Sequence, residues 1–132
     1  VVYATDAEWM RRDRPPLVGG QKPAHLHVFN RLSDIVNHNL NRYMKDADVL
    51  IFDVMYTDEE IKTKTGWGHS CISDALDLAQ QVGCKQLYLF HHDPMHDDRD
   101  VDAMERLIRE QAVERNIHTD IRAAREGQTI SL

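Results

Sequence analysis

The sequence predicts an α/β fold, in which short buried strands alternate with helices. Three apolar runs of strand length carry this prediction, at 1–5, 49–52 and 87–90. Each run is followed at once by a side chain that can bind metal or move protons, and these side chains are Asp6, Asp53 and His91. In α/β folds, ligands bind beyond the carboxyl ends of the strands. The three residues are therefore the first candidates for a functional site.

Three helices are expected between and after these strands. Ser33 is the predicted N-cap of the first helix, which runs to about Lys45. Ser73 is the predicted N-cap of the second, and Gly83 is its stop. The third helix covers about 100–115, with acidic residues near its start, where the helix dipole favours them. The residues expected on the buried faces are Ile35, Leu40 and Met44, then Ala75, Leu76, Leu78 and Ala79, then Val101, Met104, Leu107, Ile108 and Val113.

The remaining segments are expected to form loops and a terminal hairpin. Residues 11–23 are rich in Arg, Pro and Gly, a composition that is typical of a loop. Residues 117–123 and 129–132 have the pattern of two strands. The sequence contains no internal repeat and no low-complexity segment. It therefore predicts one domain over residues 1–132, in which 11–38 is an irregular insert.

Composition narrows the classes of function. The net charge of −6 offers no basic face for nucleic acid, so polynucleotide binding is not expected. No apolar run approaches the roughly 20 residues that cross a bilayer, so no membrane partner is expected. Cys71 and Cys84 are the only cysteines and form no Cys-x-x-Cys pair, which is typical of free thiols in the reducing cytoplasm. The chain opens on a strand pattern without Met, which predicts a truncated, cleaved or split product.

A cluster of histidines follows the third strand. His91, His92 and His96 lie among aspartates, and together these groups could bind metal or transfer protons at neutral pH. The alternative is that the aspartates only serve the positive end of the next helix. Both interpretations can hold. The aspartates would then serve the helix, while His91, which lies nearest the strand, would face the site.

A second histidine follows a glycine-bracketed loop. Gly66-Trp67-Gly68 leads into His69 and Ser70, where glycine permits close backbone approach and a helix start can receive phosphate. A lone histidine in a loop is otherwise ordinarily a surface residue. His25-Leu26-His27 imitates the start of the metal motif His-x-His-x-Asp-His, but the Asp and the last His are missing, so we exclude it as the primary site.

These residues resemble the metallo-β-lactamase superfamily. The run Val-Val-Tyr-Ala-Thr-Asp, ending at Asp6, is similar to the strand that carries the family's metal-bridging aspartate, and Leu-Phe-His, ending at His91, is similar to the strand whose final histidine completes the second metal site. The sequence most resembles the branch of tRNA 3′-end-processing endonucleases and cyclic-phosphate phosphodiesterases. In that branch one segment reads His-Glu-Ala-Thr, and residues 47–53 of this chain resemble it. Phe52 takes the place of the His, and Asp53 takes the place of the Glu. His69-Ser70-Cys71 resembles their His-Ser-Thr.

The resemblance implies the carboxy-terminal half of an αββα sandwich, with a mixed sheet and helices on one face. It covers nearly the whole chain and is best between 47 and 98, whereas 11–38 has no match. The family's first half supplies His-x-His-x-Asp-His and a further His, which this sequence lacks. We therefore expect the chain to be inactive alone and to need an amino-terminal half, in the same polypeptide or as a separate chain.

The resemblance also implies roles and cofactors. Asp6 and His91 would bind metal, and Asp53 and His69 would form a relay that protonates the leaving oxygen or steadies the phosphate. The weaker assignments to substrate binding are His92, His96, Ser70 and Trp67. The cofactor would be two divalent ions, zinc first, with manganese or iron as alternatives. The activity would be that of a hydrolase in which two metals activate a water to attack a small phosphodiester.

Two other interpretations stay open. The first is a non-catalytic, degenerate half-fold that has kept its site residues by descent and acts as a folding or dimerisation module. Such a half exposes a sheet face and an edge, so a homodimer would be expected. The second is a receiver-like α/β domain based on the strand-end aspartates, which ranks lower because no lysine follows a late strand in the expected place.

Overall fold

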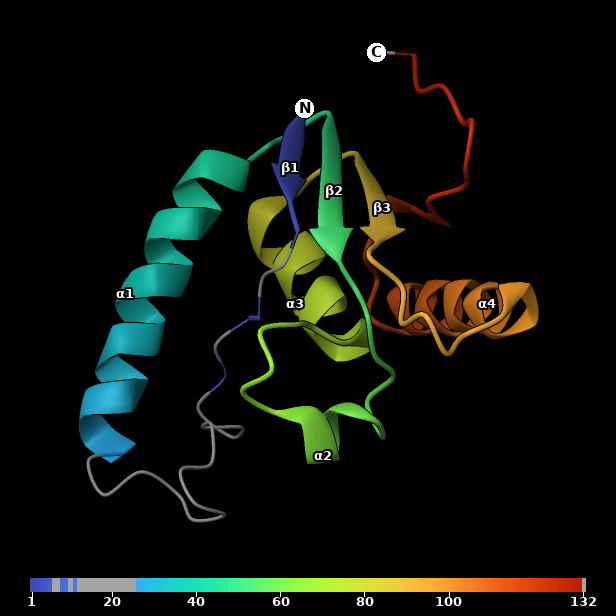
Figure 1. Ribbon diagram of the computed structural model, residues 1–132. Helices are drawn as coiled ribbons and strands as arrows, with labels where there is room; N and C mark the ends of the chain where they lie inside the picture. Colours follow the sequence, from blue (N-terminus) through green and yellow to red (C-terminus); the bar gives the residue numbers. More distant parts are fainter. Residues whose placement is uncertain (6–7, 10, 12–25, 132) are drawn as a thin grey trace.

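The sheet is parallel throughout the part of the chain that the structure describes. The computed structural model describes residues 1–5, 8–9, 11 and 26–131 (Figure 1). Its four strands pair in the order β1-β2-β3-β4. They are β1 (Val2–Ala4), β2 (Val49–Asp53), β3 (Gln86–Phe90) and β4 (Asp120–Ala123). The predicted α/β class and the first three strands are confirmed.

The expected mixed sheet and terminal hairpin are wrong. β4 pairs parallel to β3, and residues 129–131 form no strand. The physical reason is the helix before β4, which carries the chain back across the sheet, so that the next strand enters in the same direction as the others. β4 is also shorter than the expected run over 117–123.

Four helices connect the strands or lie between them. They are α1 (Leu26–Met44), α2 (Ile61–Lys64), α3 (Ile72–Val82) and α4 (Asp98–Glu114). In Figure 1, α1 runs on the β1 side of the sheet, α4 lies on the β3 side, and α3 lies between them. Parallel strands in sequential order with right-handed crossovers place their connecting helices on one face. No helix in the described residues has the length and apolar character that crossing a membrane requires.

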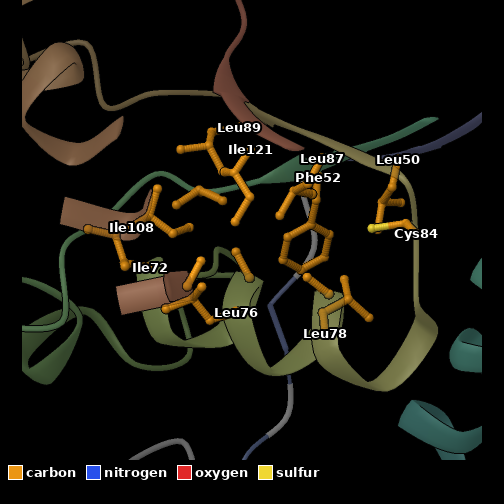
Figure 2. Close-up of a cluster of buried hydrophobic side chains, with 14 of the residues drawn as sticks. Leu50, Phe52, Ile72, Leu76, Leu78, Cys84, Leu87, Leu89, Ile108 and Ile121 are labelled. Atoms are coloured by element: carbon orange, nitrogen blue, oxygen red, sulfur yellow. The ribbon is translucent and has the colours of Figure 1, made fainter. Parts of the chain in front are cut away.

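The core lies between this face of the sheet and α3. Leu50 and Phe52 point into the core (Figure 2). Because side chains alternate along a strand, Asp53 is directed to the opposite face of the sheet. Fully burying one apolar core side chain stabilises the fold by about 1.5–3 kcal/mol. The other buried side chains that Figure 2 labels are Ile72, Leu76, Leu78, Cys84, Leu87, Leu89, Ile108 and Ile121. Phe52, which replaces the histidine of the resembling family, is therefore a core residue.

The N-terminus of α3 differs from the expectation. Its N-cap is Cys71 and not Ser73, and Asp74 completes a capping box with it. The backbone N–H of Ser73 is instead bound by the carboxylate of Asp58 at 3.1 Å, which a local motif does not reveal. The predicted stop is confirmed, since Gly83 is the C-cap in the left-handed region at φ 65°.

The first helix was predicted with the wrong start and the wrong face. α1 begins at Leu26, so Ser33 lies inside it and is buried. Met44 is buried as expected, but Ile35 and Leu40 are exposed. The reason is that α1 packs mainly on α3, through the face that carries Ser33 and Met44. The predicted bounds of α4 hold to within two residues, but its Leu107 and Val113 are also exposed.

Candidate metal and acid–base site

Asp53, His69 and His91 meet at the carboxyl edge of the sheet. Asp53 is the last residue of β2, and His91 follows β3 directly; the register pairs Asp53 with Phe90, which places the two ends side by side. His69 arrives from the loop before α3. One carboxylate oxygen, Asp53 Oδ2, lies 2.9 Å from His69 Nδ1 and 3.3 Å from His91 Nδ1. The two imidazole rings are stacked, with centroids 4.9 Å apart.

Asp53 anchors the group from a fully buried position. Its relative exposure is 0 %, so its charge depends on the polar partners around it. Oδ1 accepts a hydrogen bond of 3.2 Å from the backbone N–H of Ser70, while Oδ2 faces the two imidazoles. A carboxylate only accepts, so this contact favours the proton of His69 on Nδ1. The Nε2 atom then keeps its lone pair for a metal or for a proton.

The geometry fits a divalent metal ion. The three ligand atoms lie within 4.8 Å of one another. Asp53 Oδ2 lies 2.9 and 3.3 Å from the two Nδ1 atoms, so an ion held by these three atoms would take the place of the hydrogen bond from His69 to Asp53. One carboxylate and two imidazoles are a donor set that zinc, manganese and iron accept. The fourth predicted residue, Asp6, lies outside the described residues.

The backbone at His91 carries strain. Its φ is 61°, in the left-handed region that residues other than glycine adopt uncommonly, with Asn, Asp and His more frequent there than the rest. Such a conformation costs about 1–2 kcal/mol. A strained backbone conformation persists only where the surrounding contacts hold it in place, and such conformations are frequent at functional sites. Here it marks the turn by which the chain leaves β3 at the candidate site.

The other predicted site residues have different surroundings. Ser70 is fully buried, and its Oγ accepts a 2.8 Å hydrogen bond from the backbone N–H of Trp9. Trp67 stands at the tip of the glycine loop with 66 % of its surface exposed. His96 Nε2 lies 2.8 Å from Glu60 Oε1 and outside the Asp53 cluster. Burial lowers the pKa of His92, which favours its neutral form.

Sequence reasoning missed the side chains that hold the segment after His91. Lys64 Nζ donates to Asp93 Oδ2 at 2.9 Å and lies 4.2 Å from the ring centroid of Tyr56. The backbone N–H of Met95 and then Lys64 lower the pKa of Asp93. Hydrogen bonding to Asp93 in turn raises the pKa of Lys64. Burial raises the pKa of Tyr56, whose ring packs edge-on against His69.

Glu60 was also missed, although the sequence held a signal for it. Thr57 and Glu60 have the Thr-x-x-Glu spacing of a capping box, and Thr57 N donates to Glu60 Oε2 at 2.8 Å. Burial would raise the pKa of Glu60, but the Thr57 N–H and His96 together lower it. A hollow of about 460 Å³ adjoins Glu60 and His96 and extends along α4 to Leu107.

A solved structure shares the fold. The metallo-β-lactamase fold protein YhfI from Bacillus subtilis superimposes with a TM-score of 0.50 at 19 % identity, over 68 % of this chain and 33 % of that one. The chain therefore has the fold of part of a metallo-β-lactamase domain, with a cluster of possible metal ligands at the sheet edge. No family model matches the sequence.

Two curated relatives are ribonuclease Z proteins. The one from Brevibacillus brevis is 30 % identical over 99 residues, which is 74 % of this chain and 31 % of that protein. The one from Sulfurisphaera tokodaii is 42 % identical over 55 residues, which is 42 % of this chain and 18 % of that protein. The chain belongs to the metallo-β-lactamase superfamily, as the sequence predicted. The matched segments span about a third or less of these relatives.

Proposed function

We propose that this chain supplies one side of the active site of a metal-dependent phosphodiesterase. The observation that carries the proposal is the sharing of one buried carboxylate oxygen, Asp53 Oδ2, by the Nδ1 atoms of His69 and His91. A carboxylate behind an imidazole fixes the ring and makes its outer nitrogen a better ligand or base. The similarity to two ribonuclease Z proteins supports the same class of chemistry.

Each residue has a distinct role in this proposal. His91 and Asp6 hold the metal, which would be two divalent ions in the complete fold: zinc first, or manganese or iron. When bound, the metal lowers the pKa of a water and neutralises charge on a phosphoryl oxygen. Asp53 fixes the tautomer and orientation of His69. His69 then delivers a proton from Nε2 to the leaving oxygen, so that the alcohol departs neutral.

The proposed substrate is a small phosphodiester, and the proposed partner is an amino-terminal half of the fold. The net charge of −6 favours a small phosphodiester over a polynucleotide. Trp67, His92 and His96 lie on the loops that border the cluster and are candidates for substrate contact. Ligands beyond those in this chain would come from an amino-terminal half, in the same polypeptide or in a separate chain. The two buried free cysteines favour a reducing compartment, the cytoplasm.

The test combines metal binding with hydrolysis of a chromogenic phosphodiester by the chain together with the amino-terminal half. We expect His69→Ala to lower kcat about 10²- to 10⁴-fold while zinc stays bound, since it removes the proton donor. Asp53→Asn should lower zinc affinity by about tenfold or more. Asp48→Asn, which changes an exposed acid just before the same strand, is the matched control. Full activity of His69→Ala, or no zinc binding by the unmodified protein, would refute the proposal.

A second candidate function is a non-catalytic association module. Exposed apolar side chains gather on α1, and they are Leu32, Ile35, Val36, Leu40 and Tyr43. Tyr3, on the edge strand β1, is also largely exposed. Such surface favours pairing with a second copy. Light scattering and zinc titration separate the two candidate functions. A dimer that binds no zinc and that Leu32→Glu dissociates supports the association module. A monomer that binds zinc excludes it.

A further inference from the structure

Glu8 joins the segment after β1 to the loop that carries His69. Its carboxylate accepts hydrogen bonds from the backbone N–H of Gly66, at 2.9 and 3.0 Å to its two oxygens. It also accepts one from the N–H of Gly68, at 3.0 Å. These contacts link positions 58 and 60 residues apart in the sequence. Bonds from an N–H to an ionised acceptor are about twice as strong as neutral ones.

The backbone of the glycine loop is shaped to hold this carboxylate. Gly66 and Gly68 have φ values of 88° and 94°, in the region that favours glycine. Successive N–H groups in such turns can converge on one anion. A Cβ at Gly68 would meet no atom within 4 Å, so free space would allow a side chain there. The conformation that brings both N–H groups to Glu8 is thus what requires glycine at this position.

His69 is held on both sides by this arrangement. On one side, Gly68 is bound by Glu8. On the other, the Ser70 N–H is bound by Asp53, and the Ser70 hydroxyl oxygen is bound by the N–H of Trp9. Trp9 belongs to the hydrophobic core, so the segment of Glu8 and Trp9 has a fixed anchor. His69 therefore has little freedom to leave the Asp53 carboxylate.

We propose that Glu8 is a positioning residue for His69. It clamps the glycine loop so that His69 stays against Asp53 and stacked on His91. Any effect of Glu8 on proton transfer by His69 rests on the proposed phosphodiesterase function. The hold of Glu8 on the glycine loop does not.

The test compares three variants of the chain by ¹⁵N NMR and by zinc titration. Glu8→Ala removes the acceptor, and Glu8→Gln keeps one side-chain oxygen that can accept both N–H groups. Glu59→Ala is the matched control, because Glu59 is an exposed acid that pairs only with Lys62 among the contacts the structure gives. In Glu8→Ala we expect large chemical-shift changes of the backbone amide signals of Gly66 and Gly68 and of the ring nitrogen signals of His69. We expect zinc affinity to stay as in the unmodified chain, because Glu8 positions the proton donor and not a metal ligand.

The conservative variant separates positioning from a general structural role. Glu8→Gln should restore the His69 signals, and Glu59→Ala should change neither these signals nor the zinc affinity. Unchanged His69 signals in Glu8→Ala, or equally large changes in Glu8→Gln, would overturn the proposal. If the unmodified chain binds no zinc, the proposed function fails, while the NMR comparison still decides whether Glu8 holds the loop.

Discussion

Two loops bring histidines to the candidate site, and they are held by different forces. The glycine loop (66–70) carries His69, and the histidine loop (91–97) begins with His91. Both lead into a helix with a capping box, at α3 and α4. The glycine loop is fixed mainly by backbone N–H groups that donate to oxygen atoms. The histidine loop is fixed by contacts between side chains, which are the Lys64–Asp93 ion pair and the Glu60–His96 hydrogen bond.

The difference lies in how far each anchor is removed from water. Ser70 and Asp53, which hold the glycine loop, are fully buried. The pairs Lys64–Asp93 and Glu60–His96, which hold the histidine loop, keep part of their surface in solvent. Exposed charges are screened by salt, whereas buried groups such as Ser70 and Asp53 are screened much less. We therefore expect salt and acid to loosen the histidine loop first.

The largest effect on stability is expected at Ser70. Ser70→Ala removes the oxygen that accepts from the buried N–H of Trp9. An unsatisfied buried donor costs about 1–3 kcal/mol, so we expect the free energy of unfolding to fall by about 2 kcal/mol. Urea unfolding measures it, and the loss should be the same at low and high salt. Thr63→Ala, which removes an exposed hydroxyl from α2, is the control and should change stability little.

This prediction would fail if Ser70→Ala cost no more than Thr63→Ala. It would also fail if the loss at Ser70 depended on salt, because the contrast between the two loops would then disappear.

A smaller effect is expected at Lys64, in the histidine loop's ion pair. The side chains of Lys64 and Asp93 are 26 % and 11 % exposed, whereas those of Lys85 and Asp48 are 74 % and 65 % exposed. Lys64→Met keeps the apolar stem and removes the charge. We expect Lys64→Met to lower the free energy of unfolding at low salt by less than Ser70→Ala does, with a loss that shrinks at high salt, and we expect almost no loss for Lys85→Met. Equal losses in the two variants would show that burial does not set the strength of these pairs.

The sequence predicts the part of the site that follows from strand order. Asp53 and His91 each end or follow an apolar run, and parallel neighbouring strands bring such ends together. The strands β2 and β3 and the stop of α3 at Gly83 were predictable because their signals are local. His69 could be named from the glycine loop, and its contact with Asp53 was expected from the resemblance to the metallo-β-lactamase superfamily but not from any local pattern.

The rest depends on contacts between distant residues, for which the sequence has no local signal. Glu8 meets Gly66, and His96 meets Glu60 36 residues away, only after the chain has folded. The face of α1 was predicted wrongly for the same reason, because the packing partner α3 selects the face that carries Ser33 and Met44. Helical periodicity finds an apolar stripe, but it does not show which neighbour, if any, covers it.

The smallest effect is expected at Glu60, and it depends on pH. The pKa of Glu60 lies below its ordinary value of 4.5, because the N–H of Thr57 and His96 outweigh the effect of burial. A lowered carboxyl pKa stabilises the fold fully above the ordinary value, and this stability is lost as the pH falls through the folded-state pKa. The side chain is 34 % exposed, so screening keeps the contribution to about 0.5 kcal/mol.

Urea unfolding of Glu60→Gln should therefore show a free energy of unfolding that is lower than that of the unmodified chain by a constant amount above about pH 5. The difference should shrink below about pH 4.5. A deficit that grows on acidification would mean that His96 and Thr57 do not hold Glu60 in its ionised form, and that the histidine loop does not lose this anchor in acid.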